Sequence, residues 1–314
     1  TAILAHSMNI PTVIGIGDEF LANIRPGEQA LVDGFSGEVI LEPDAGVLSK
    51  LTAPQEKSTD TSEGTHTADG THVSIYSVDD PCAPLPEYAD GIAVFGCPLL
   101  SDETKQYEYY RAIAERTPDC RAIIRMPVIS SKDPDRQIKY DQQIRAVFRA
   151  ASHGEPGILF PMITSVPEAR KILAACDDAK MELRAEGVKC SENVKIGFMV
   201  EIPAAAIISD CLAPMADFFI IDSDSIARHT LACYEEDCFS PDFADGQLEA
   251  VMRLIGNSAR NAVKNGARIG ICGSLAGDTS LTGDFLRMGI DNFCVTPDRL
   301  AEVRKRVTEV DLEV

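Results

Sequence analysis

Short apolar runs alternate with longer amphipathic stretches from residue 72 to the end of the chain. Near-continuous apolar runs are typical of strands buried on both faces of a parallel sheet, and helical periodicity fills most of the intervals, for example residues 167–187 and 247–266. Eight strands alternating with helices over about 240 residues predict an α/β fold of the (β/α)8 TIM-barrel type. A doubly wound open sheet is the alternative that strand counting leaves open. The eight runs begin at His72, Gly91, Arg121, Gly157, Lys195, Asp217, Arg268 and Asn292.

The N-terminal part of the chain has a different pattern. Residues 1–50 predict a small β-rich unit that begins with a short helix, because brief β-rich runs are separated by Gly and Pro. Residues 51–70 are rich in Ser, Thr, Gly, Asp and Glu, so they bury too little apolar surface to offset their ordering entropy and predict a mobile linker. The barrel is then expected over residues 71–314. The three predicted strands of the first unit cover residues 11–15, 29–33 and 38–42.

Charge and hydropathy restrict the class of partner. The chain has 29 Lys and Arg against 49 Asp and Glu, a formal net charge of −20. Such an acidic surface repels nucleic-acid phosphates and anionic lipids, so we expect neither nucleic acid nor a membrane as partner. No apolar run reaches the roughly 18 residues of a spanning helix, and no basic-then-apolar leader is present. These features predict a soluble protein.

Ten cysteines are spread along the chain without any C-x-x-C pair, and several lie inside apolar runs. This distribution favours reduced, mostly buried thiols over a disulfide framework or a zinc site. It therefore predicts a cytoplasmic location.

Candidate chemistry lies at the carboxyl ends of the predicted strands, where the active sites of (β/α)8 barrels are built. Glu201 closes the apolar strand GFMV and precedes Pro203, and Arg125 has the same position on its own strand. Both side chains are therefore expected at the barrel mouth. The other strand-end candidates are Gly96, Met162, Asp222 to Ser225, Cys272 to Ser274, and Thr296.

Several of these strand-end segments resemble one known family. The segments GFMVEIPAAA, ADFFIIDSDSIARHTLA, GICGSLAGD, GILFPMITSVPEAR and ADGIAVFG are similar, in the same order, to the C-terminal barrel of Enzyme I. Enzyme I is the phosphoenolpyruvate–protein phosphotransferase of the bacterial sugar phosphotransferase system. The N-terminal TAILAHSMNIPTVIGIG resembles the end of the swivelling phosphohistidine domain of that family, so the resemblance covers nearly the whole chain.

The resemblance implies a barrel that binds phosphoenolpyruvate and magnesium and passes the phosphoryl group to a histidine of the swivelling domain. It also implies a homodimer formed through outer helices and a phosphocarrier protein as a possible partner. The acceptor histidine of the family immediately precedes the Thr that matches Thr1, so it is absent from this sequence. His6 falls where the family usually has Arg and is not expected to replace it.

Carried over residue by residue, the resemblance assigns roles to five positions. Cys272 matches the cysteine that donates a proton to the methylene carbon of the enolpyruvate, and Gly273 follows it as in the family. Arg125 matches a phosphate-binding arginine, and Glu201 matches a metal-binding carboxylate. Asp224 matches the Asn of the family's Asn-Asp pair. The resemblance thus implies Cys272 as catalytic residue, Arg125, Asp224 and Gly273 as substrate-binding residues, and Glu201 with Asp224 as magnesium ligands.

Other positions depart from the family. Two phosphate-binding arginines are replaced by Gly96 and Glu235, the Asp of the Asn-Asp pair by Ser225, and a Glu by Ser274. The segment that carries a further arginine is absent between the third and fourth strands. Phosphoenolpyruvate is close to trianionic and needs several guanidinium groups. Each unit-charge pair at about 5 Å is worth roughly 3 kcal/mol at an effective dielectric near 20, so these losses predict impaired phosphoenolpyruvate binding and activity.

Three functional readings remain open. In the first, the barrel is still a phosphotransferase, which binds phosphoenolpyruvate poorly or takes its acceptor histidine from a separate chain. In the second, it is a catalytically inactive homologue that acts as a regulatory or interaction module. Alternatively it binds another small oxyacid, such as pyruvate or oxalate, which needs fewer positive charges. Structural roles also remain open: Asp222 and Asp224 as loop carboxylates or a helix N-cap, Cys272 as a small buried side chain, and Arg125 as the partner of acidic neighbours.

Overall fold

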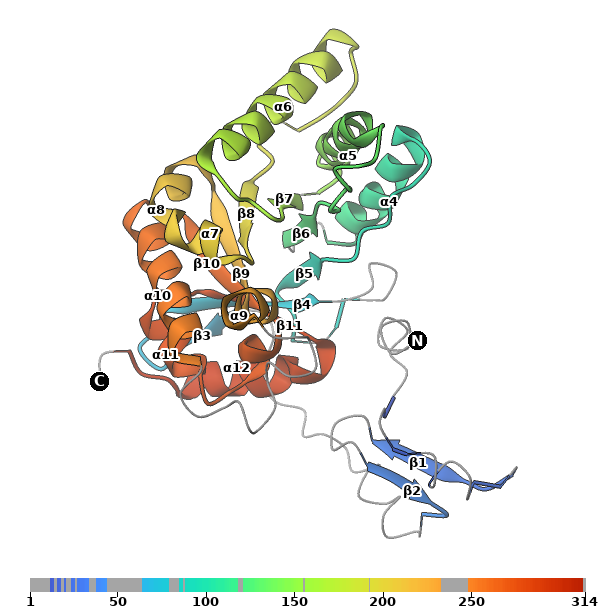
Figure 1. The fold of residues 1–314 in the computed structure, drawn as a ribbon, viewed down its shortest axis with the longest axis vertical. Helices are drawn as coiled ribbons and strands as arrows, with labels where there is room; N and C mark the ends of the chain where they lie inside the picture. Colours follow the sequence, from blue (N-terminus) through green and yellow to red (C-terminus); the bar gives the residue numbers. More distant parts are fainter. Residues whose placement is uncertain are drawn as a thin grey trace. The chain divides into compact units, whose positions relative to one another are not determined.

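The chain divides into two compact units, residues 1–60 and residues 61–314, which are treated separately. In the first unit, β1 (Ala30–Asp33) and β2 (Glu38–Leu41) form an antiparallel pair, which confirms two predicted strands (Figure 1). The predicted strand at 11–15, the helix before it and residues 51–63 of the predicted linker fall wholly or mostly outside the described residues. The computed structural model describes residues 12–13, 16–17, 20, 24–25, 27–33, 38–43, 64–78, 85–86, 88–117, 121–154, 156–191, 193–232 and 248–312.

The second unit is a closed barrel of parallel strands. Each strand pairs in parallel with the next one along the chain, and the last, β11, pairs in parallel with the first, β4, which closes the ring (Figure 1). This confirms the predicted (β/α)8 barrel and excludes the open doubly wound sheet. The strands are β4 (His72–Val78), β5 (Gly91–Val94), β6 (Arg121–Arg125), β7 (Pro156–Phe160), β8 (Ile196–Val200), β9 (Phe218–Asp222), β10 (Arg268–Cys272) and β11 (Asn292–Val295).

Helices cover the outside of the strand ring (Figure 1). Among the described helices, none is both long and apolar enough to cross a bilayer. The helices are α4 (Glu103–Arg116), α5 (Arg136–Ala150), α6 (Val166–Ala185), α7 (Pro203–Ile207), α8 (Ser209–Leu212), η1 (Ala213–Met215), α9 (Ser223–Leu231), α10 (Leu248–Lys264), η3 (Ser274–Gly277), α11 (Thr282–Arg287), η4 (Pro297–Arg299) and α12 (Leu300–Glu309).

A short hairpin precedes the barrel. The strand β3 (Thr65–His66) pairs antiparallel with β4, and Asp69 accepts hydrogen bonds from the hydroxyls of Thr67 and Thr71 and from the backbone N–H of Leu312. Hydrogen bonds from the Thr71 hydroxyl and the Leu312 N–H lower the pKa of Asp69 to about 2. Residues 64–70 therefore fold onto the barrel, whereas the sequence analysis places them in a linker: the Thr and Asp that suggested a linker instead make the turn. The remaining domain boundaries stay predictions.

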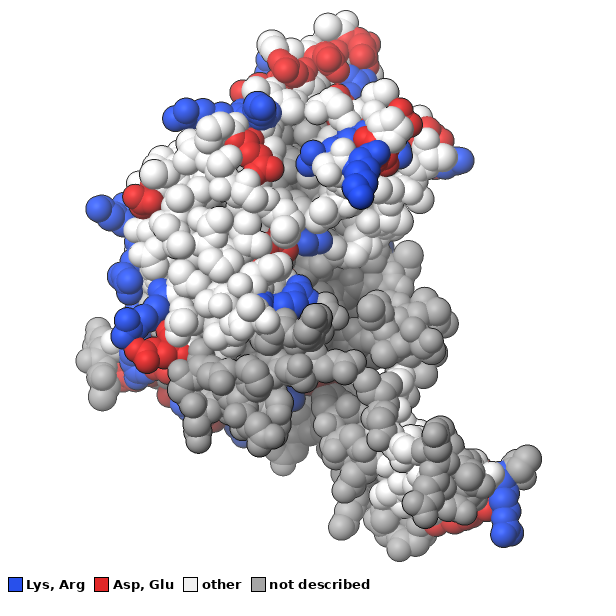
Figure 2. All heavy atoms as spheres, in the orientation of Figure 1, with Lys and Arg blue, Asp and Glu red and all other residues white. Residues whose placement is uncertain are grey.

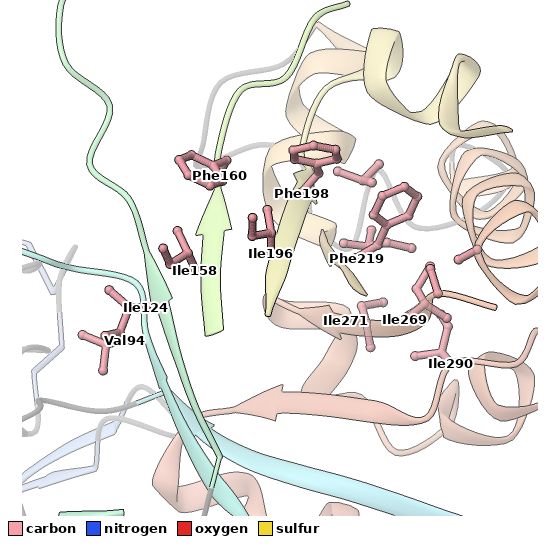
Figure 3. Packing of buried hydrophobic residues seen from close by; sticks show 14 of the residues in the cluster. Val94, Ile124, Ile158, Phe160, Ile196, Phe198, Phe219, Ile269, Ile271 and Ile290 are labelled. Carbon is pink, nitrogen blue, oxygen red and sulfur yellow. The ribbon is translucent and has the colours of Figure 1, made fainter. Parts of the chain in front are cut away.

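Side chains alternate between the two faces of every barrel strand, as the period of two requires. The helix-facing set, which includes Phe160, Phe198 and Phe219, forms the main core between the sheet and the helices (Figure 3). A second cluster fills the inside of the ring, and each strand contributes one member to it, as in a packed barrel interior. In strand order, these members are Tyr76, Ala93, Ile123, Leu159, Met199, Ile220, Cys272 and Cys294.

Glycines at inward positions make room at the amino-terminal end of the ring. A Cβ placed on Gly197 would lie 2.3 Å from the Phe218 ring, and one on Gly270 would lie 2.7 Å from Ile220 Cδ1 and 2.9 Å from the backbone oxygen of Asn292. The Phe218 ring and the Ile220 side chain thus occupy the space that side chains at these positions would take. The interior is closed at this end and leaves the carboxyl end as the open mouth.

We expect Gly270→Ala to destabilise the barrel by about 1–3 kcal/mol, because the backbone of Asn292 cannot move away from the new methyl group. Thermal denaturation of the variant measures this cost. Gly96→Ala is the matched control: nothing lies within 4 Å of its added Cβ, so its melting temperature should stay within a degree or two of the wild type, or rise slightly. Equal losses in both variants would contradict the packing argument.

Candidate functional site

The candidate site occupies inward positions at the carboxyl ends of neighbouring strands. Arg125 lies two residues after Ile123, and Cys272 lies two residues after Gly270, so both share the inward face of their strands. Glu201 follows Met199 by the same interval, immediately after β8. The strand register therefore brings these side chains together at the mouth of the barrel. Cys272 belongs to the interior cluster, and Arg125 and Glu201 lie one inward position beyond its members Ile123 and Met199.

Arg125 and Glu201 form an ion pair at this mouth. The Arg125 Nη2 lies 3.1 Å from Glu201 Oε2, with the Glu201 side chain 3% exposed and the Arg125 side chain 20% exposed. The Arg125 Nε also contacts the Met199 sulfur at 3.0 Å. A carboxylate this deeply buried requires a charged partner, and removal of one member of such a pair costs about 3–5 kcal/mol. Arg125 is thus bound to an acidic neighbour, which is the structural role left open above.

The second carboxylate oxygen of Glu201 is bound by the loop after β7. The backbone N–H of Met162 donates to Glu201 Oε1 at 2.5 Å. Met162 has φ +56°, in the left-handed region that a non-glycine residue seldom adopts. Such strain persists where the surroundings enforce it, and the hydrogen bond to a buried carboxylate is a suitable cause. Met162 was a strand-end candidate, but this backbone role leaves no pattern in the sequence.

Asp222 caps the helix that follows β9. Its Oδ1 accepts from the backbone N–H groups of Asp224 and Ser225, each at 3.1 Å, and its Oδ2 accepts from the Ser225 hydroxyl at 2.8 Å. Asp222 is therefore the N-cap of α9, which confirms that alternative. Ser225, at the position of a family Asp, serves this cap.

Asp224 and Gly273 pack against each other across the mouth. Asp224 Oδ1 accepts from the backbone N–H of Ser274 at 2.8 Å and from the Ser223 hydroxyl at 3.3 Å. Gly273 has φ +90°, and a Cβ there would lie 2.4 Å from Ser223 Oγ and 2.9 Å from Asp224 Cγ, so only glycine fits. Burial raises the pKa of the Asp224 carboxyl, the hydrogen bond from Ser274 opposes this shift, and the charge of Asp222 adds to it.

Cys272 lies below these carboxylates and is 3% exposed. Burial raises the pKa of its thiol well above the usual value, and the charges of Asp222 and Asp224 raise it further, whereas Arg125 lowers it. The thiol is therefore fully protonated at neutral pH. It can donate a proton to an adjacent atom, but it is a poor nucleophile.

Two further residues face the site without having been predicted. His229 Nδ1 lies 2.7 Å from the carbonyl oxygen of Ser225 and 3.1 Å from that of Glu201, and because both are acceptors, Nδ1 carries the proton. Cys97 lies just after β5, and burial raises the pKa of its thiol to about 12 while Arg125 lowers it. Both residues have a local partner, the carbonyl of Ser225 for His229 and that of Val94 for Cys97, whereas the contact of His229 with the Glu201 carbonyl depends on the fold.

The arrangement of these carboxylates does not fit a protein-held magnesium ion. Both Glu201 oxygens are bound, one by Arg125 and the other by the Met162 N–H, and both Asp222 oxygens accept from α9. Asp224 Oδ1 is likewise bound by Ser274. In the described part of the chain, no group of three or more His, Cys, Asp or Glu side chains is placed to hold a metal. Glu201 and Asp224 as magnesium ligands therefore remain a prediction that this geometry does not favour.

The structure thus brings together most of the predicted site residues. Arg125 and Glu201 are paired, Gly273 contacts Asp224, and the charges of Arg125 and Asp224 both act on Cys272. At Gly96, a Cβ would have nothing within 4 Å, so the space directly beside this strand-end position is open. Glu235, Thr1 and His6 lie outside the described residues.

Comparison with known proteins identifies the family of the barrel. A family model described as "PEP-utilising enzyme, PEP-binding domain" matches residues 129–312. The phosphoenolpyruvate-protein phosphotransferase of Priestia megaterium is 28% identical over 99% of this chain and 61% of its own length. The corresponding protein of Haloferax volcanii gives the same 28%, 99% and 61%. The chain therefore spans 61% of the length of these curated relatives.

Solved structures show the likeness of fold alone. The malate synthase of Haloferax volcanii, in its lead(II) complex, has a TM-score of 0.55 at 14% identity and covers 81% of this chain and 76% of that one. The family assignment depends instead on the sequence match, which extends over more than half of the chain and includes Glu201, Asp224 and Cys272. The protein belongs to the family of PEP-utilising enzymes through its PEP-binding domain.

Proposed function

We propose that the barrel binds phosphoenolpyruvate, or a smaller oxyacid of the same kind, at its mouth. The observation that carries the proposal is the placement of one guanidinium, Arg125, beside the protonated thiol of Cys272 at the carboxyl ends of the strands. Arg125 binds the carboxylate or phosphate, and Glu201 competes with that ligand for the guanidinium. Gly273 lets the side chains of Ser223 and Asp224 pack against the backbone directly after the thiol.

The charge balance of the mouth favours the smaller oxyacid. Three carboxylates, of Glu201, Asp222 and Asp224, lie at the mouth with two guanidinium groups. Arg125 pairs with Glu201, and Arg228 donates to the Ser225 hydroxyl that binds Asp222. A phosphate ester carries more negative charge than oxalate or pyruvate and is repelled more strongly by these carboxylates. The ligand order that we expect is oxalate and pyruvate before phosphoenolpyruvate. This supports the alternative of a barrel recruited to another oxyacid.

Cys272 supplies the proton that the proposed chemistry requires. By the resemblance, a cysteine at this place protonates the methylene carbon of enolpyruvate, and a thiol with a strongly raised pKa remains protonated until that step. The phosphoryl transfer of the family further needs a histidine acceptor from outside the barrel, which the resemblance puts before Thr1. Transfer to a phosphocarrier protein, homodimer formation and a cytoplasmic location are part of the proposal on the same ground.

Magnesium has a limited place in this proposal. Magnesium bound with phosphoenolpyruvate would neutralise negative charge on the ligand, and its protein ligands would be Glu201 and Asp224. In the ligand-free arrangement, however, Arg125 already neutralises Glu201, so we propose that oxyacid binding depends on Arg125 first and on the metal second. The effect of a Glu201 substitution on oxyacid affinity shows whether binding depends mainly on Arg125 or mainly on the metal.

We expect oxalate to raise the melting temperature without magnesium, and Glu201→Gln to tighten oxalate binding about tenfold (about 1.4 kcal/mol), since it removes the competing charge from Arg125. A ligand at 100 times its Kd adds about 2.7 kcal/mol, a shift of roughly 5–10 °C for a barrel of this size. Thermal-shift titrations with oxalate, pyruvate and phosphoenolpyruvate, each with and without magnesium, measure this.

Arg125→Met tests the same site from the other side. It should abolish the thermal shift with oxalate, and its melting temperature without ligand shows whether it folds. If it does not fold, the double variant Arg125→Met with Glu201→Gln removes both members of the buried ion pair and takes its place. Arg260→Ala, on the exposed face of α10, is the control for loss of an arginine. A magnesium-dependent shift that Glu201→Gln abolishes would contradict metal-independent binding and favour the magnesium site of the family. No shift with any of the three ligands would favour a regulatory or interaction module.

Cys272 should resist alkylation by iodoacetamide at pH 8, whereas the exposed Cys211 reacts. Mass spectrometry of peptides from native protein measures both rates, and unfolded protein provides the control in which both react. Asp222→Asn preserves the helix cap but removes a charge that raises the thiol pKa, so it should increase the rate at Cys272. A rate at Cys272 equal to that at Cys211 in the native protein would contradict its assignment as a protonated group.

A further inference from the structure

A pocket of about 540 Å³ lies outside the strand ring, between α5 and α6 and the loops after β6 and β7. This volume is within the range of about 300–1,000 Å³ that is usual for small-molecule sites. Its inner wall is apolar and includes Ile129, Ile144 and Ile172. The two helices lie side by side in Figure 1, and neither Arg125 nor Cys272 lines the pocket.

Two cations line this pocket without a carboxylate partner. Neither Arg136 of α5 nor Lys171 of α6 forms an ion pair with any described residue. The pattern differs farther along the same helices, where Arg145, Arg149 and Lys180 are each paired with a carboxylate. On the face shown in Figure 2, side chains of both signs gather over α5 and α6. In a chain with a net charge of −20, the absence of a counter-charge from these two positions leaves the pocket locally positive.

The acidic residue of the pocket does not neutralise them. Glu168 lines the pocket, but its Oε2 accepts from both the backbone N–H and the hydroxyl of Thr164, at 2.9 and 2.8 Å. These bonds belong to the first turn of α6, where Ser165 is the N-cap. These bonds hold the carboxylate at the start of α6 but leave its negative charge, which also acts on Tyr140. With two cations against this one carboxylate, the pocket lining keeps one net positive charge for a ligand.

Tyr140 adds a hydrogen-bond donor. Its ring lies under the Arg136 guanidinium, 5.9 Å from the ring centroid, and its hydroxyl has no hydrogen-bond partner in the described part of the chain. Burial raises the pKa of this hydroxyl, while the charge of Arg136 lowers it, so it remains protonated at neutral pH. A ligand whose flat or branched apolar part lies on the inner wall would have its anionic end close to Arg136, Lys171 and Tyr140.

We propose that this pocket is a binding site for a small organic anion with an apolar body. The carboxylate or phosphate of the ligand pairs with Arg136 and Lys171 and accepts from Tyr140, and its hydrocarbon or aromatic part lies on the inner wall. The site is separate from the mouth but shares a residue with it, because Met162 lines the pocket and its backbone N–H binds Glu201. The proposal does not depend on oxyacid binding at the mouth.

Phenyl phosphate and phenylacetate serve as probes in isothermal titration calorimetry with the full chain, and inorganic phosphate and benzyl alcohol represent their separate halves. We expect at least one aryl anion to bind more tightly than either half. Lys171→Ala and Arg136→Ala should each weaken that binding roughly tenfold, as expected for a charge-assisted hydrogen bond. Arg170→Ala is the matched control, since it removes the neighbouring exposed charge on α6 without altering the pocket lining, and it should leave the affinity unchanged.

A pair of filling variants tests the apolar part. Ala175 lines the pocket and Ala174 is exposed beside it on the same helix, so Ala175→Phe should abolish binding and Ala174→Phe should not. Arg125 does not line the pocket, although its charge acts on Tyr140, so Arg125→Met should weaken binding of the aryl anion far less than Lys171→Ala does. The proposal is overturned if neither probe shows saturable binding at millimolar concentration, if Arg170→Ala weakens binding as much as Lys171→Ala, or if Arg125→Met alone abolishes it. The last result would place the anion at the mouth instead.

Discussion

The parallel pairing of β11 with β4 is the constraint on which the rest of the structure depends. Once the ring is closed, the period of two along each strand leaves one face pointing inward, and eight side chains fill the interior with one from each strand. The next inward positions then converge at the carboxyl ends. Arg125 and Glu201, 76 residues apart in the chain, are paired as a result of this geometry rather than of local sequence.

The electrostatics of the mouth follow from the same closure. Apolar side chains below and the loops around the mouth exclude water, so a carboxylate there needs a partner within the site. Arg125 and the Met162 N–H satisfy Glu201, the α9 amides satisfy Asp222, and Ser274 satisfies Asp224. Cys272 has no such partner for a thiolate and remains protonated among these charges. The polar groups of the mouth are therefore satisfied by one another, and a ligand must replace one of these interactions in order to bind.

Sequence reasoning reached the fold and the residues of the site but not their partners. The eight strands are apolar on both faces and separated by helical periodicity, so each could be recognised from local pattern alone. The engagement of Glu201 by Arg125 depends on register across three strands, and the left-handed backbone of Met162 has no sequence signal. Composition predicts a linker at residues 64–70, where the structure has a hairpin. Thr and Asp are common both in solvent-exposed loops and in turns that their side chains stabilise by hydrogen bonds, so composition does not distinguish the two.

The positive charges of this acidic chain are neutralised unevenly. Where α4, α5 and α6 meet, the single side chain of Arg145 forms ion pairs with three carboxylates, those of Glu103, Glu182 and Glu186. About two to three turns away along α5 and α6, Arg136 and Lys171 border the pocket, and neither forms an ion pair with a described residue. A net charge of −20 repels anions at long range, but salt screens that field within about 10 Å, so the local arrangement decides where an anion binds. Unpaired cations beside an apolar wall therefore indicate an anion site, and the negative total charge of the chain does not argue against it.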